Sequence, residues 1–134
     1  FGVTNSLNLR WYYFIGGQAV INSTGTVSLN TWHHVAVVRD GDDYEVFIDG
    51  VSGGSQSLSG DLASKDMLFG DFAENLDYNG HIDEFRFSNI ARYTAGFTAP
   101  TEPFQNDANT LLLLHCDGSD GDTDFIDDNG KEST

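Results

Sequence analysis

The chain has 134 residues, of which 21 are acidic and 6 are basic, so its formal net charge is −15 at pH 7. Such a strongly negative chain repels phosphate groups, which excludes DNA and RNA as partners. The sequence has no run of about eighteen apolar residues, so we expect no membrane insertion, and its one cysteine, Cys116, cannot form an internal disulfide.

Short apolar stretches separated by turn-forming residues begin near the N-terminus. Residues 7–17 form an aromatic-rich segment that ends in a Gly-Gly pair, and residues 18–25 hold a short strand and a polar turn. No window shows a sustained 3.6-residue apolar stripe, which argues against a helical bundle. Fifteen glycines against two prolines suit short strands joined by tight turns. The pattern therefore predicts an all-β protein.

The clearest predicted element is a β-hairpin. Residues 32–39 alternate with a period of two, and residues 40–43 supply a turn of Asp and Gly. The return strand, residues 44–48, alternates in the same way and places Tyr44 on the same face as Val46 and Ile48. A second tight turn is predicted at Asp49-Gly50, because Gly accepts a positive φ without a steric clash.

Further short strands are predicted in the second half of the chain. They lie around Leu58 within a polar loop, at residues 67–72, at residues 80–88 and at residues 109–118. Between the last two, residues 89–104 indicate one short helical turn followed by an extended arm, which two prolines keep out of a central strand. Strands about ten residues apart with turns between them are typical of an antiparallel β-sandwich.

Three stretches together resemble the laminin-G-like, concanavalin A-like lectin/glucanase superfamily. They are TWHHVAVVR leading to FIDG within residues 31–50, GHIDEFR at 80–86 and ARYTAGFTAP at 91–100. The resemblance covers residues 8–104 and implies a jelly-roll sandwich of two antiparallel sheets, with Trp32 in its core. The variant with the RYT…F…P arm resembles tandem-repeat modules of bacterial surface proteins and of phage virions. It therefore implies an extracellular, cell-surface or virion location.

The C-terminal strand departs from the pattern of this family, in which a similar stretch opens the domain. We therefore expect a sandwich over residues 1–108 that lacks its N-terminal strands, and a terminal strand with an acidic tail over residues 109–134. This terminal segment either completes the same sandwich, starts the next repeat or crosses to a neighbouring copy. The candidate assembly strand, which is too apolar to stay in water, consists of Leu111, Leu112, Leu113 and Leu114.

We expect no enzyme activity, although the superfamily includes glucanases. Retaining glycoside hydrolysis needs two carboxylates about 5 Å apart, and the adjacent Asp83 and Glu84 would point to opposite faces of a strand. That stretch is expected to be structural. No Ser or Cys triad stands out, and His33 and His34 lie on opposite strand faces, which argues against a shared metal. A glycoside hydrolase is the remote alternative.

The leading functional hypothesis is a non-catalytic module for adhesion or recognition of glycans or another cell-surface ligand. Aromatic side chains with a few polar groups typically line small-ligand sites. The candidate ligand-binding residues are Tyr78, Asp77, Tyr44 and Phe72. The alternative hypothesis is a structural module that assembles with neighbouring copies, head to tail or by strand donation, in a surface fibre or virion.

No cofactor is required by this sequence, but Ca²⁺ is a candidate ligand of the acidic tail. Calcium takes six to eight oxygen donors, and carboxylates supply them. The candidate calcium ligands are Asp117, Asp120, Asp122 and Asp124. A second acidic cluster, Asp71, Glu74 and Asp77, lies in a loop where laminin-G-like folds often hold ligands. The alternative for the tail is an acidic turn that stays hydrated.

Overall fold

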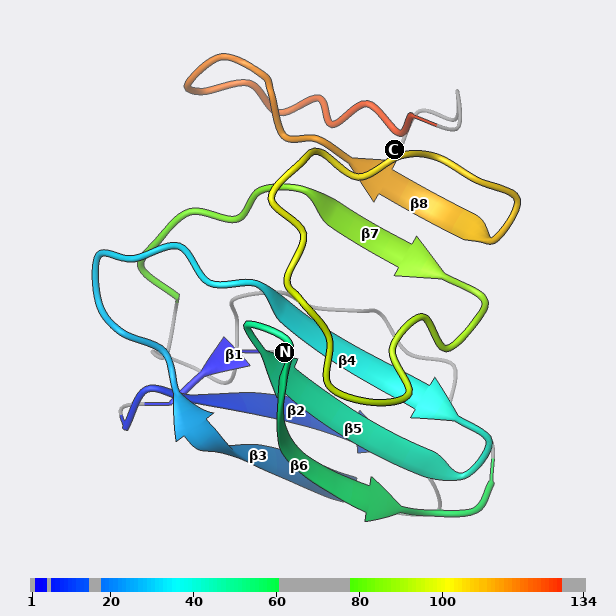
Figure 1. Cartoon of the computed structure of the whole chain (residues 1–134). Coiled ribbons are helices and arrows are strands. Elements are labelled where there is room, and N and C mark those ends of the chain that lie inside the picture. The colour runs from blue at the N-terminus through cyan, green and yellow to red at the C-terminus, as the bar shows by residue number, and fades with distance from the viewer. Residues whose placement is uncertain (1, 5, 15–17, 61–77, 129–134) are drawn as a thin grey trace. The chain divides into compact units, whose positions relative to one another are not determined.

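The computed structural model describes residues 2–4, 6–14, 18–60 and 78–128, and this part of the chain is all-β and antiparallel (Figure 1). Its strands are β1 (Gly2–Val3), β2 (Asn8–Phe14), β3 (Gln18–Thr26), β4 (Val35–Asp40), β5 (Asp43–Ile48), β6 (Val51–Ser57), β7 (Phe85–Ser88) and β8 (Thr110–Leu114). The sheets have the orders β1-β2-β3, β4-β5-β6 and β7-β8. The predicted all-β antiparallel fold is confirmed. None of the described residues forms a helix that could span a membrane.

The chain divides into two compact units. The first comprises Phe1–Asn79 and Tyr93–Ala99, and the second comprises Gly80–Arg92 and Pro100–Thr134. The first unit therefore contains β1 to β6, whereas β7 and β8 belong to the second. Strand β7 is thus grouped with β8, the strand that it pairs with, and the domain boundary expected after residue 108 stays a prediction.

The predicted hairpin is β4 and β5, which pair in register from Val35↔Ile48 to Asp40↔Asp43. Gly41, at the first position of the two-residue turn, has a φ of 62°. At the next turn Asp49 and Gly50 both have positive φ, 52° and 79°. A type I′ turn requires this of both central residues, and Asp-Gly is one of its favoured pairs. Both predicted turns are confirmed.

The core of the first unit lies between the sheets β1-β2-β3 and β4-β5-β6, which form a β-sandwich. The buried side chains are Ile21, Tyr44 and Val46, and the partly buried Trp11, Val37 and Leu58 pack against them. The period of two along β5 turns Tyr44 to the same face as Val46. Tyr44 is only 1% exposed, so its ring is not accessible to a ligand, contrary to the sequence-based expectation.

Trp32 also departs from its expected place. It was expected in the core, but 67% of it is exposed. The reason lies in the strand boundary, because β4 begins only at Val35 and Trp32 belongs to the loop between β3 and β4. The first part of the TWHHVAVV stretch is therefore a loop, and only its second part is a strand.

Two other segments differ from the prediction. Residues 51–57 form strand β6 although Gly and Ser are poor strand formers, because they pair with β5 from Ile48↔Val51 to Asp43↔Ser57. Residues 89–104 contain no helix. The strand predicted at residues 67–72 lies outside the described residues.

In the second unit β8 pairs with β7 of the same chain, from Phe85↔Leu114 to Ser88↔Thr110. Leu113 is completely buried, whereas Leu111 is about half exposed. Of the alternatives for the terminal segment, the structure thus gives β8 a partner strand within its own chain.

Two contacts between charged side chains brace the second unit. Arg92 donates from both terminal nitrogens to the Asp107 carboxylate, at 2.9 and 2.7 Å, and this hydrogen bonding holds the pKa of Asp107 well below its usual value. Glu84 accepts hydrogen bonds from the Phe104 amide and from His115 Nδ1, at 2.7 and 2.8 Å. The bond to Glu84 raises the pKa of His115. Through these bonds Glu84 joins Phe104 and His115 within the second unit.

The outer edge of β8 is held by the buried carboxylate of Asp127. Its Oδ1 atom accepts a hydrogen bond of 3.0 Å from the Leu113 amide, and the Asp128 amide donates to the Leu113 carbonyl at 2.9 Å. An Asp127→Ala variant would leave the amide of Leu113 without this acceptor. We expect a loss of about 1–3 kcal/mol in the free energy of unfolding, measured by urea denaturation.

Asp128→Ala is the matched control, because its hydrogen bond to Leu113 comes from the backbone and its side chain is exposed. Its effect should stay within about 0.5 kcal/mol, as for most surface substitutions. Equal losses for the two variants would contradict the role given to the Asp127 carboxylate.

Candidate functional site

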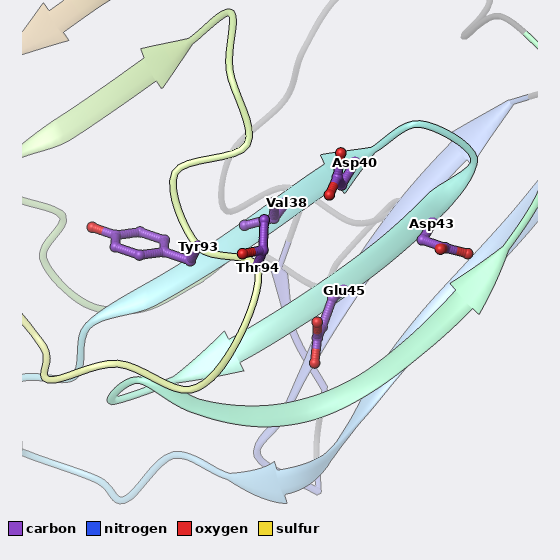
Figure 2. Close-up of a pocket in the computed structure, with 6 residues that line it drawn as sticks. All are labelled: Val38, Asp40, Asp43, Glu45, Tyr93 and Thr94. Atoms are coloured by element: carbon purple, nitrogen blue, oxygen red, sulfur yellow. The ribbon is translucent and has the colours of Figure 1, made fainter.

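A small pocket opens on the face of β4 and β5 that points away from the sandwich core (Figure 2). Its volume is about 140 Å³, and its lining residues are Val38, Asp40, Asp43, Glu45, Tyr93 and Thr94. Pockets that bury a drug-sized ligand measure roughly 300–1,000 Å³. This pocket therefore suits a small chemical group or one end of a longer ligand.

Strand register explains why three carboxylates share this face. Val38 pairs with Glu45, and Asp40 pairs with Asp43 across the two-residue turn. Directly paired residues have Cβ atoms about 4.5–5.5 Å apart, and residues two apart along a strand point the same way. Asp40, Asp43 and Glu45 therefore project from the same side of the hairpin (Figure 2).

Serine hydroxyls of β6 hold two of these carboxylates. Ser57 donates to Asp43 and Ser52 donates to Glu45. None of the described residues that line the pocket is Lys or Arg. The nearby Arg39 belongs to the opposite face of β4, where its guanidinium lies 5.3 Å from the centre of the Tyr44 ring. The pocket therefore presents negative charge and hydrogen-bond acceptors.

The segment that carries Tyr93 and Thr94 is fixed to the hairpin by aromatic contacts. The Tyr93 ring stacks on Phe97 at 3.6 Å between centroids with 9° between planes, and Phe97 lies 5.4 Å from Phe47 of β5. His34 meets both of the stacked rings edge-on, at 5.8 and 5.4 Å. The Phe97 amide also donates to the Gly50 carbonyl at 2.9 Å. These contacts place Tyr93 and Thr94 at the pocket.

A second polar group, which the sequence did not reveal, lies near the other end of β4. Nε2 of His33 is 2.9 Å from Oγ of Ser28, and Nδ1 of His33 is 2.7 Å from Oδ2 of Asp49. The Asp49 Oδ1 atom accepts a hydrogen bond of 2.9 Å from the His34 amide. This order of groups is that of a Ser-His-Asp triad.

The contacts of the Ser28 amide argue for a structural clamp at this place. That amide donates to His33 Nε2 at 3.0 Å, so the lone pair that a general base would use is already engaged. The clamp also keeps Asp49 ionised. Partial burial acts to raise the pKa of Asp49, but the hydrogen bonds from His33 and His34 lower it below its usual value. The hydrogen bonds that link Ser28, His33 and Asp49 therefore fix the loop between β3 and β4 to the Asp49 turn.

The predicted ligand-binding residues differ in their exposure to solvent. Tyr78 is exposed in the described part of the chain, and Tyr44 is in the core. Asp77 and Phe72 lie outside the described residues, as does the rest of the second acidic cluster. The pocket acids were not predicted, because Asp40 and Asp43 were interpreted only as turn formers. The alternation across a two-residue turn is the signal that could have found them.

The four candidate calcium ligands are not gathered into one site. Among the described residues, no group of three or more His, Cys, Asp or Glu side chains could hold a metal ion. Asp122 instead accepts a hydrogen bond of 2.7 Å from the Ser119 amide within its own turn. Calcium binding by the tail stays a prediction, without support from side-chain geometry.

Comparison with known proteins gives one match. Residues 1–95 match a family model described as the concanavalin A-like lectin/glucanases superfamily. This range contains β1 to β7 and all the described residues that line the pocket, including Tyr93 and Thr94. No curated protein and no solved structure matches the chain.

Proposed function

Because the chain belongs to the concanavalin A-like lectin/glucanases superfamily, we propose that it is a non-catalytic module that recognises glycans through the pocket on β4 and β5. The module would serve adhesion or recognition in an extracellular, cell-surface or virion-borne protein. The observation that carries the proposal is that three acidic residues, Asp40, Asp43 and Glu45, line one pocket together with Tyr93 and Thr94.

These groups match the chemistry of a sugar. Sugar hydroxyls donate hydrogen bonds, which ionised Asp and Glu side chains can only accept. Serine hydroxyls occupy one oxygen each of Asp43 and Glu45, and the second oxygen of each carboxylate is not engaged by those bonds. Tyr93 adds an aromatic residue to the lining, with its ring directed away from the three carboxylates (Figure 2). The pocket thus offers mainly hydrogen-bond acceptors.

Charge selects among the classes of glycan. With no basic residue among the lining residues that the structure describes, the three carboxylates repel sialic acids, uronic acids and sulfated sugars, since like charges brought together at an interface cost free energy. The ligand class that we propose is therefore a neutral or amine-bearing sugar at the end of a chain, consistent with the small volume of the pocket.

A glycan array tests this function. We expect the wild-type protein to bind neutral or amine-bearing glycans, and the Asp40→Asn, Asp43→Asn, Glu45→Gln triple variant to bind them at least about tenfold more weakly. Hydrogen bonds to charged groups are worth about 1.5–3 kcal/mol, and 1.4 kcal/mol corresponds to tenfold in affinity. Asp42→Asn is the matched control, because Asp42 lies in the same turn but does not line the pocket. Equal binding by all three proteins would contradict the site.

Hydrolysis is the outcome that would replace recognition with catalysis. The superfamily name covers both lectins and glucanases, and the spacing of two acids decides the type of hydrolysis in glycosidases. Each glycan bound on the array, together with a β-glucan, should therefore be incubated with the protein and assayed for new reducing ends. Their release by the wild type and not by the triple variant would make the module an enzyme.

The alternative function is structural, with copies assembled head to tail or by strand donation. The half-exposed Leu111 on β8 favours it, but the pairing of β8 with β7 in the same chain leaves less reason for donation. Absence of glycan binding both with and without Ca²⁺ would favour this alternative. Binding that requires Ca²⁺ would instead assign a role to the acidic tail.

A further inference from the structure

One long stretch of this acidic chain carries no formal charge. Residues 11–38 contain no Asp, Glu, Lys or Arg, although 20% of the whole chain consists of these residues. The stretch includes the loop between β3 and β4. Where it reaches the surface, it forms an area that does not repel a second negatively charged molecule.

This loop and the neighbouring strand ends expose large apolar side chains. Val35 and Val51 are both paired with Ile48 and thus flank it on either side, and Trp32 precedes Val35 by three residues. We call these side chains the end patch. It consists of Leu29, Trp32, Val35 and Val51, which are 71%, 67%, 36% and 69% exposed.

The loop that carries the patch is held in place. Ser28 bonds His33, and His33 bonds Asp49 of the next turn, as described above. The Thr31 hydroxyl also donates to the Leu29 carbonyl at 3.3 Å. Fixing the backbone costs conformational entropy, about 1–2 kcal/mol per residue, and here it presents Leu29 and Trp32 to solvent without burying them. An ordered display of apolar side chains is typical of an interaction surface.

We propose that the end patch is a docking surface for a second copy of this chain. Two molecules with a charge of −15 repel each other through most of their surfaces. Asp49 is the one acidic side chain of the loop and the adjoining turn, and it is paired with His33. Because the patch is uncharged and apolar, it is complementary to itself, as a twofold contact requires.

The size of the patch sets the strength of the contact. Stable complexes bury about 800 Å² on each partner, which is more than four side chains provide. The dimer should therefore be weak and in rapid exchange with monomers. The contact would leave the acidic part of the pocket open, because Asp40 lies at the other end of β4 from Val35, about 17 Å along the strand at 3.3 Å per residue.

Sedimentation equilibrium of the full chain tests the proposal. We expect a monomer–dimer equilibrium that strengthens as salt is raised, because salt screens the repulsion between the two acidic molecules while the apolar contact persists. Trp32→Ala should raise the Kd at least tenfold, and Val51→Thr should raise it severalfold. Ile126→Ala is the control, since Ile126 is 79% exposed in the second unit and its loss should leave the Kd unchanged.

The following results would contradict dimerisation through the end patch. A protein that stays monomeric up to about 1 mM, the weak end of specific association, would overturn the proposal. Dimerisation that weakens with salt or is unaffected by Trp32→Ala and Val51→Thr would do the same. A Trp32→Ala variant that loses glycan binding but dimerises normally would make the patch a sugar platform instead. Because these side chains are exposed, urea denaturation should show all three variants folded like the wild type.

Discussion

Replacing Gly50 with alanine is expected to detach the segment around Phe97 from the hairpin and to lower the free energy of unfolding by at least about 2–3 kcal/mol. A Cβ atom at this position would lie 1.8 Å from the backbone carbonyl oxygen of Phe97, and Gly50 has a φ of 79°. The left-handed conformation costs an L-residue about 1–2 kcal/mol, and the displaced hydrogen bond costs about 1 kcal/mol more.

The chain offers a matched control for backbone strain in Gly41. It also has a positive φ, 62°, but no atom lies within 4 Å of the position that its Cβ would take. Gly41→Ala should therefore show the strain alone, about 1–2 kcal/mol. Urea denaturation of both variants gives the comparison, and equal losses would show that the Phe97 segment is not seated on Gly50.

The Gly50→Ala variant also links the fold to the site. Tyr93 and Thr94 reach the pocket because Phe97 is seated on the hairpin. A variant that loosens Phe97 should thus weaken glycan binding even under conditions where the sandwich is still folded. Gly41→Ala should leave the binding unchanged, which separates this effect from a general loss of stability.

Phe47→Ala is expected to be the most destabilising truncation in the hairpin, at about 3–5 kcal/mol. Phe47 is completely buried on the outer face of β5, where it contacts the Phe97 ring. Truncation removes a large apolar surface from the contact and leaves a cavity that neighbouring strands cannot fill. Thermal and urea denaturation measure the loss directly.

Phe87→Ala is the comparison for that measurement, because Phe87 lies in a strand but is 43% exposed. Its truncation should cost well under half as much, since only part of its surface leaves water on folding. If the two variants lost similar stability, the contact of Phe47 with Phe97 would not stabilise the outer face of β5, and the seating of Tyr93 at the pocket would need another explanation.

The parts of the fold that sequence reasoning found are those encoded locally. The hairpin of β4 and β5 follows from strict alternation and from two turns at which Asp and Gly accept unusual backbone angles. Strand β8 follows from its run of leucines. In such segments the local pattern and the tertiary contacts favour the same structure.

The errors arise where tertiary contacts decide. Residues 51–57 are rich in Gly and Ser, and they become a strand only because β5 offers them a partner. Trp32 was placed in the core by resemblance, but the strand that would carry it inward begins three residues later. Residues 89–104 were expected to start with a helical turn, whereas the aromatic rings of this segment are positioned by Phe47 and Gly50.

The candidate site was missed for a related reason. Tyr44 was counted among the ligand-binding residues although its own alternation already placed it with Val46, in what is the core face. The pocket residues Asp40 and Asp43 become cross-strand neighbours only when the turn between them is known to have two residues. Tyr93 lies far from them in sequence, so no local pattern could have joined it to the site.

The most direct test of the glycan site is a ¹H–¹⁵N NMR titration of the full chain with glucosamine, N-acetylglucosamine and glucuronate. The pocket predicts chemical-shift changes centred on residues 38–45 and on Tyr93 and Thr94, largest with glucosamine and smallest with glucuronate. Shift changes that avoid these residues, or glucuronate binding as tightly as the other two sugars, would contradict it.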